Sequence, residues 1–176
     1  ERTRAPGAVV SLWGALGMGK SRVALEAARE AWNARDVVYV DAEGARTPDV
    51  VAEKALAALG GARSGDAAQT SEAIARAMSA RGTLLVLDGV EGVSADLGPL
   101  ARTWLAGGEE LPREPSGTVL LVARARAASA DVAIEIGPLA EDVAAQLYAA
   151  RAAERAPLAP SAASEVAARI ARAVSG

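Results

Sequence analysis

Eight consecutive residues near the start of the chain have the types and spacing of a phosphate-binding loop. They read Gly14-Ala15-Leu16-Gly17-Met18-Gly19-Lys20-Ser21 and fit the pattern G-x-x-x-x-G-K-[ST]. Glycines let the backbone curl around an anion with its N–H groups pointing inward. We expect Lys20 to reach the β- and γ-phosphates, Ser21 to offer its hydroxyl to Mg²⁺, and the following helix to direct its positive end at the same point. Residues 14–21, with Arg22 directly after them, are therefore the predicted nucleotide-binding residues.

A hydrophobic run that ends in an acid supplies a candidate partner for the metal. Residues 83–87 are almost entirely apolar, and Asp88 follows them. If this strand is a parallel neighbour of the strand before the loop, Asp88 lies at the same sheet edge, close to Ser21. The sequence thus predicts Ser21 and Asp88 as Mg²⁺ ligands. The alternative is that Asp88 only forms the turn after the strand.

Attack of water on a γ-phosphate also needs an acid or amide that orients the water, and no such residue directly follows Asp88. Gly89 follows Asp88 directly, so an adjacent second carboxylate is missing. Glu91 is the nearest candidate, with a solvated loop acid as the alternative. Asp41 and Glu43 end an earlier strand at the same predicted edge, and we expect them to cap the next turn.

Arginines after a further strand could stabilise phosphate charge. The apolar run over residues 118–122 leads into Arg124 and Arg126. A cation at this position can interact with a γ-phosphate. Arg124 is the better placed, Arg126 is the alternative, and both could instead be solvated. Lys20, Glu91 and Arg124 are the predicted catalytic residues. Five further arginines on helical patterns are expected on solvated faces: Arg102, Arg151, Arg155, Arg169 and Arg172.

Five short apolar runs alternate with amphipathic helical patterns. The expected strands span residues 8–12, 37–40, 83–87, 118–122 and 132–136. This alternation predicts an α/β fold, a three-layer α/β/α sandwich with a five-stranded parallel sheet. In the first helix Val23, Ala27 and Ala31 fall on one face, with Ala24, Ala28 and Trp32 beside them. A later helix is expected to be lined by Val143, Leu147 and Ala150, and the last one by Val166, Ile170 and Val174.

Composition excludes several kinds of chemistry. The 176 residues include no cysteine and no histidine, so there is no disulfide, thiolate metal site or imidazole base. The net charge of −3 gives no general attraction to nucleic acid or anionic membrane, and no apolar stretch approaches the length of a membrane span. We expect a single cytoplasmic domain over residues 1–176, a fragment of a larger multidomain protein. The three tryptophans and two tyrosines are expected in the core or in helix packing.

The order of these segments resembles the nucleotide-binding module of the STAND class of P-loop ATPases. It is most similar to bacterial regulators of the AfsR and MalT type and is related to NB-ARC modules. The resemblance is carried by segments at residues 9–25, 38–43, 47–50, 57–60, 84–91, 119–124, 136–139 and 144–148. Relatives usually carry a Gly-Arg-Glu segment before the first strand and a second acid where Gly89 stands here.

The resemblance implies an ATP- and ADP-binding switch that requires Mg²⁺, turns over slowly and controls signalling, often to transcription. Its implied partners are other domains of the same polypeptide and further copies of itself, and neither nucleic acid nor membrane is contacted directly by this segment. The guanine-specific pattern [NT]-K-x-D cannot be formed with either lysine, which favours adenine nucleotides. Two alternatives stay open: a non-hydrolytic nucleotide-binding scaffold and a small-molecule P-loop kinase.

Overall fold

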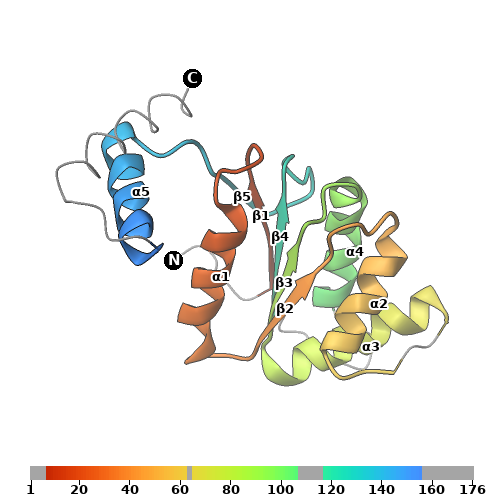
Figure 1. The fold of residues 1–176 in the computed structure, drawn as a ribbon. Coiled ribbons are helices and arrows are strands. Elements are labelled where there is room, and N and C mark those ends of the chain that lie inside the picture. Colours follow the sequence, from red (N-terminus) through yellow and green to blue (C-terminus); the bar gives the residue numbers. More distant parts are fainter. Residues whose placement is uncertain (1–6, 63–64, 107–116, 156–176) are drawn as a thin grey trace. The chain divides into compact units, whose positions relative to one another are not determined.

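The chain forms two compact units, residues 1–136 and residues 137–176 (Figure 1). The computed structural model describes residues 7–62, 65–106 and 117–155. The predicted helix through Val166, Ile170 and Val174 lies outside the described residues. Among the described residues, no helix is both long and apolar enough to cross a membrane.

The first unit is built on a five-stranded parallel sheet, as predicted. Its strands are β1 (Ala8–Trp13), β2 (Val37–Asp41), β3 (Leu84–Asp88), β4 (Thr118–Ala123) and β5 (Val132–Glu135). They are hydrogen-bonded in the order β2-β3-β4-β1-β5, and every pair is parallel. Each strand bound lies within one residue of the predicted bound.

One expectation about the sheet is wrong. The strand that ends in Asp88 was expected beside the strand before the loop, but β4 lies between β3 and β1. The consequence for the site is small, because the carboxyl ends of all parallel strands lie along the same edge. Asp88 is thus one strand further from the loop than the sequence suggested.

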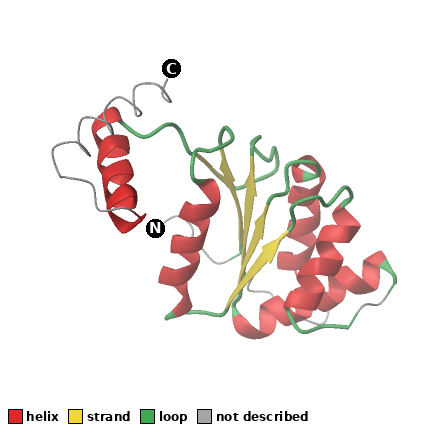
Figure 2. Cartoon of the chain, in the orientation of Figure 1, coloured by secondary structure: helices red, strands yellow, loops and turns green. Residues whose placement is uncertain are grey.

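Helices cover both faces of the sheet and complete the three predicted layers (Figure 2). One face carries α1 (Lys20–Trp32), and the other carries α2 (Pro48–Ala58), α3 (Ala67–Arg81) and α4 (Ser94–Ala106). Consecutive residues of a strand belong to the hydrophobic cores on opposite faces of the sheet: Val9 packs on the side of α2–α4, and Val10 packs on the side of α1. Because both faces are covered, the strands are apolar almost throughout.

Of the two neighbouring stripes that the sequence indicates for helix α1, the one through Ala24 and Ala28 is buried against the sheet. Ala24 and Ala28 are buried, whereas Val23 is 44% exposed. The buried stripe begins with Lys20, which is itself buried, and continues at intervals of four residues. The phosphate-loop lysine therefore sets the rotation of the helix, and small alanines below it allow a close approach to the sheet.

The aromatic residues divide between core and surface. Trp104 is fully buried in α4, as expected, but Trp32 is 68% exposed. The expectation of a core or packing role is therefore wrong for Trp32. This residue ends α1 beside Val37 and Tyr39 of β2, which is an edge strand of the described sheet.

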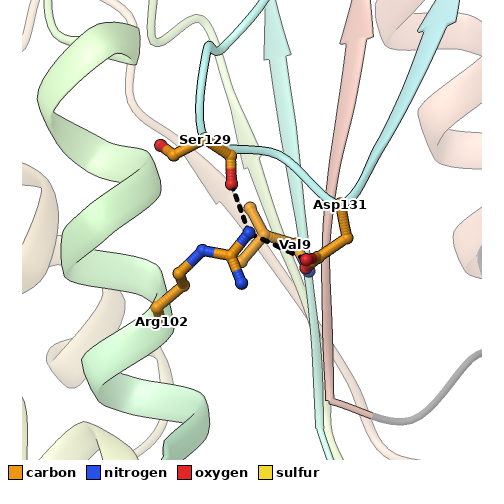
Figure 3. Close-up of polar contacts among 4 residues, drawn as sticks. All are labelled: Val9, Arg102, Ser129 and Asp131. Atoms are coloured by element: carbon orange, nitrogen blue, oxygen red, sulfur yellow. Dashed lines mark hydrogen bonds and ion pairs between the residues drawn. The ribbon is translucent and has the colours of Figure 1, made fainter.

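Polar contacts of Asp131, which directly precedes β5, connect it to Arg102 of α4 and to Val9 of β1 (Figure 3). Asp131 Oδ2 accepts a hydrogen bond from the Val9 N–H at 2.8 Å, and its Oδ1 accepts one from Arg102 Nη2 at 2.8 Å. Arg102 also donates to the Ser129 carbonyl at 2.7 Å. Burial by itself raises the pKa of Asp131. The hydrogen bond from the Val9 N–H and the Arg102 guanidinium lower the pKa by more than burial raises it, so the pKa lies below its usual value. Arg102 is exposed, as expected, but the sequence did not indicate these two contacts.

The second unit contains α5 (Glu141–Arg155), which agrees with the predicted helix through Val143, Leu147 and Ala150. Its first turn carries Glu141 and Asp142, acids of the sign that the positive end of a helix favours.

Candidate nucleotide-binding site

The predicted phosphate loop has the backbone that an anion cradle needs. It leaves β1 after Trp13 and enters α1 at Lys20. Gly17 and Gly19 have φ values of +82° and +83°, which residues with a Cβ rarely adopt. No atom lies within 4 Å of the point where a Cβ at either glycine would stand. The loop therefore curls as predicted and leaves open space on that side.

The N-terminus of α1 is free to receive an anion. Gly19 is its N-cap, none of the described side chains caps it, and its first turn contains no acid. Uncapped N–H groups at a helix start, with the positive end of the helix dipole, favour phosphate. Lys20 Nζ donates a hydrogen bond to the Ala15 carbonyl at 2.8 Å, so the ammonium lies against its own loop.

A cavity of about 790 Å³ opens beside the loop and the ends of the strands. Ligand cavities are usually roughly 300–1,000 Å³. Five residues predicted from separate parts of the sequence line it together: Lys20, Ser21, Asp88, Glu91 and Arg124. The loop contributes Leu16, Gly17 and Gly19 as well. Among the predicted loop residues, Gly14, Ala15, Met18 and Arg22 are not part of its lining, and Arg22 instead pairs with Glu26 along the helix at 3.1 Å.

Asp88 is held by a neighbour that the sequence reasoning missed. The Tyr39 hydroxyl on β2 donates to Asp88 Oδ2 at 2.7 Å. Burial is the largest cause that raises the pKa of Tyr39, and the hydrogen bond to the Asp88 carboxylate raises it further. The hydroxyl therefore stays protonated and remains a donor. The hydrogen bond uses one carboxylate oxygen and restricts the rotation of the group. The available signal was the period of a strand, since Tyr39 lies two residues before Asp41 on the same face.

Glu91 and Arg124 face each other across the cavity lining. Arg124 Nε lies 3.8 Å from Glu91 Oε1, a long ion pair between side chains that are 61% and 34% exposed. The alternative arginine, Arg126, is exposed and is not part of the cavity lining. The structure thus places the preferred arginine, and not its alternative, beside the loop.

The segment that leaves β2 forms another wall of the cavity. Asp41, Glu43, Gly44, Ala45 and Arg46 all line it. Asp41 Oδ1 accepts a hydrogen bond from the Glu43 N–H at 2.9 Å, which is the turn-capping role expected of Asp41. Arg46 was missed, because no spacing in the sequence connects it to the loop.

The donor set fits a magnesium ion that is bound together with phosphate. Among the described residues, no group of three acids could hold a metal by itself. Mg²⁺ typically takes one or two protein carboxylates and completes its shell with phosphate oxygens and water. Ser21 and Asp88 both line the cavity and have oxygen atoms of the kind that such an ion binds. The lining holds four carboxylates against three cations, so a divalent ion would reduce the repulsion of a polyphosphate: Asp41, Glu43, Asp88 and Glu91 against Lys20, Arg46 and Arg124.

Solved structures of several other proteins share the fold of this chain. Cdc6p of Pyrobaculum aerophilum matches with a TM-score of 0.70 and 15% identity over 94% of this chain and 50% of its own. The ORC2 protein of Aeropyrum pernix, solved as ADPNP-ADP complexes, matches with a TM-score of 0.63 and 15% identity over 86% of this chain and 47% of its own.

A STAND protein with a tetratricopeptide repeat sensor from Pyrococcus horikoshii also matches, with a TM-score of 0.51 and 17% identity over 94% of this chain and 26% of its own. At these identities the likeness concerns the fold, and the chain spans half or less of each of these proteins. No curated protein sequence matches the chain.

A sequence-family comparison matches residues 4–127 to the AAA domain. The match includes the loop, Asp88 and Arg124, and it covers most of the unit that carries the cavity. The chain therefore belongs to the AAA domain family of P-loop nucleotide-binding modules.

Proposed function

We propose that this chain binds ATP and ADP with Mg²⁺ and acts as a slow ATPase switch within a larger regulatory protein. The observation that carries the proposal is the cavity in which the glycine loop, the uncapped start of α1, Lys20 and Asp88 meet. A triphosphate is the ligand that satisfies all of these groups together.

Each group in the cavity has a role in this proposal. The N–H groups of the loop over residues 14–22 hold the phosphates, and Lys20 interacts with the β- and γ-phosphates. Ser21 and Asp88 hold Mg²⁺, which neutralises phosphate charge. Arg124 stabilises charge at the γ-phosphate. Two acids of the lining are available to orient the attacking water, Glu91 and Glu43.

The switch role rests on the wider resemblance and on chain length. The ordered segments resemble STAND regulators, and the fold is shared with a STAND protein of which this chain matches 26%. We propose that the partners are other domains of the same polypeptide and further copies of the chain, in a cytoplasmic regulator of transcription. The net charge of −3 supports a segment that does not contact nucleic acid itself.

A second function is favoured by one observation. Gly89 stands directly after Asp88, where a second acid would otherwise stand. A chain without any group that orients the attacking water would bind ATP without hydrolysing it. Such a non-hydrolytic scaffold would use the nucleotide only to stabilise its fold. Release of phosphate by the unmodified chain distinguishes the switch from the scaffold.

The binding proposal is tested by Lys20→Ala, with Lys54→Ala as the matched control. Lys54 is the only other lysine, and its Nζ binds the exposed Asp41 carbonyl outside the loop. At ATP·Mg²⁺ a hundredfold above its Kd, binding stabilises a protein by about 2.7 kcal/mol. For a domain of this size the melting temperature then rises by roughly 5–10 °C. We expect this shift in the parent and in Lys54→Ala and its loss in Lys20→Ala; an equal shift in Lys20→Ala refutes the assignment.

A further inference from the structure

Gly89 and Glu43 occupy adjoining positions beside Asp88. Gly89 has a φ of +80°, and a Cβ built on it would lie 3.0 Å from the Glu43 nitrogen and 3.2 Å from the Glu43 Cβ. Such distances are shorter than ordinary contacts between these atoms. The space into which a side chain at position 89 would extend is therefore taken by Glu43.

The sheet register explains why Glu43 reaches this point. Asp41 of β2 is paired with Asp88 of β3, so the chain that leaves β2 passes beside Gly89. The Ala42 N–H donates to the Asp88 carbonyl at 2.7 Å, and the Glu43 N–H donates to Asp41 Oδ1 at 2.9 Å. Two successive hydrogen bonds thus fix the backbone from which the Glu43 side chain departs.

Glu43 is also the less engaged of the two candidate acids. Glu91 is paired with Arg124, which attracts its charge. Within the described part of the chain, Glu43 forms no ion pair, and its exposed side chain lines the same cavity as Lys20 and Ser21. A carboxylate in this position is free to accept a hydrogen bond from water.

We infer that Glu43, from the end of β2, takes the role of the second acid that is missing after Asp88, and that it orients and deprotonates the attacking water. The inference rests on the proposed ATP-binding function. The water oxygen forms a bond to the γ-phosphorus while the bond from that phosphorus to the bridging oxygen breaks, and the bond pair leaves with ADP. The water proton passes to the Glu43 carboxylate and then to solvent, so the products are ADP, inorganic phosphate and one proton.

The experiment compares Glu43→Gln with the rival candidate Glu91→Gln in the whole chain. The matched control is Glu72→Gln, because Glu72 pairs with Arg76 at 2.6 Å on α3 and does not line the cavity. Three quantities are measured: the Kd for ATP·Mg²⁺ by equilibrium fluorescence with a labelled nucleotide, single-turnover phosphate release, and the ATP-to-ADP ratio retained after incubation and gel filtration. Loss of a general base costs roughly 10²–10⁴-fold in rate. We expect Glu43→Gln to bind ATP with a Kd within about twofold of the parent, to release phosphate at least about 100-fold more slowly, and to retain mainly ATP. We expect Glu72→Gln to release phosphate at close to the parent rate, since it only removes an exposed ion pair away from the cavity. A loss in Glu91→Gln as large as that in Glu43→Gln overturns the inference.

The remaining outcomes count against the inference. Equal rates in Glu43→Gln and the parent, or a loss of ATP binding in Glu43→Gln, overturn it. A parent that binds ATP without turnover also overturns it but leaves nucleotide binding intact. A parent that fails to bind ATP overturns the proposed function as well, so the two failures are distinguishable.

Discussion

Replacing Gly89 with alanine should destabilise the chain more than the same replacement at Gly44. The two glycines have nearly equal φ values, +80° at Gly89 and +78° at Gly44. A Cβ at Gly44 would meet nothing within 4 Å, whereas one at Gly89 would lie 3.0 Å from the Glu43 nitrogen. The pair therefore separates the cost of the backbone conformation from the cost of the contact.

The magnitudes follow from these two terms. A left-handed conformation costs a residue with a Cβ about 1–2 kcal/mol. Reduced freedom of the unfolded chain offsets about 0.4–1 kcal/mol of this, and both effects apply equally to Gly44→Ala and Gly89→Ala. Only Gly89→Ala adds the overpacking cost, about 1–3 kcal/mol, because the atom it meets belongs to backbone that two hydrogen bonds hold in place. The melting temperatures of the two variants should differ by roughly 2–12 °C.

The measurement is thermal and urea unfolding of both variants without nucleotide, since Gly44 and Gly89 line the cavity. Unfolding slopes in urea check that the denatured states are comparable. Equal stability of Gly44→Ala and Gly89→Ala refutes the close approach of Glu43 to position 89. Since that approach also supports the proposed role of Glu43, the inference would lose its geometric basis without any enzyme assay.

Two further predictions concern groups that the sequence reasoning missed or misplaced. Asp131→Ala should lower the free energy of unfolding by about 1–3 kcal/mol, because it leaves the fully buried Val9 N–H without its acceptor. The pKa of Asp131 is lower in the folded than in the unfolded chain, so the stability that its carboxylate contributes is complete above about pH 3.9 and is lost as the pH falls through the folded pKa. Urea unfolding of Asp131→Ala and the parent should therefore show a smaller difference in the free energy of unfolding at pH 3 than at pH 7. An equal difference at the two pH values contradicts this explanation. Tyr39→Phe removes the hydrogen bond that orients Asp88 and should weaken Mg²⁺ binding to the ATP complex by about tenfold, measured by magnesium titration, with Mg²⁺-free ADP binding as the control; unchanged or tighter Mg²⁺ binding contradicts a positioning role for Tyr39.

Periodicity and turn chemistry were enough to predict the architecture. All five strands lie within one residue of their expected bounds, because runs such as residues 84–87 are apolar at every position and are bounded by turns. The rotation of α1 was not predictable in the same way. Its alanines satisfy two neighbouring stripes equally well, and the choice is made by Lys20, which has to face the loop. The order of the strands was also missed, since no local pattern indicates that β4 lies between β1 and β3.

The sequence predicted the site residues that belong to a short local motif. It did not predict contacts between residues on two neighbouring strands. The loop and Asp88 follow from short patterns, and the common sheet edge then brings Glu91 and Arg124 to the same cavity. Tyr39 was missed because its contact with Asp88 depends on the β2–β3 register. The contact of Arg102 with Asp131 was missed for a related reason, since Asp131 lies 29 residues away, directly before β5.

Gly89 has opposite meanings in the two descriptions of the chain. Along the sequence it is a missing acid and therefore an argument against hydrolysis. In the structure it is the residue that lets Glu43 approach Asp88, because any side chain at position 89 would meet the backbone that carries Glu43. The pairing of Asp41 with Asp88 aligns the two strand ends, so an acid two residues after Asp41 can compensate for a glycine one residue after Asp88. A substitution that restores the second acid at position 89 should for this reason displace Glu43 and lower phosphate release.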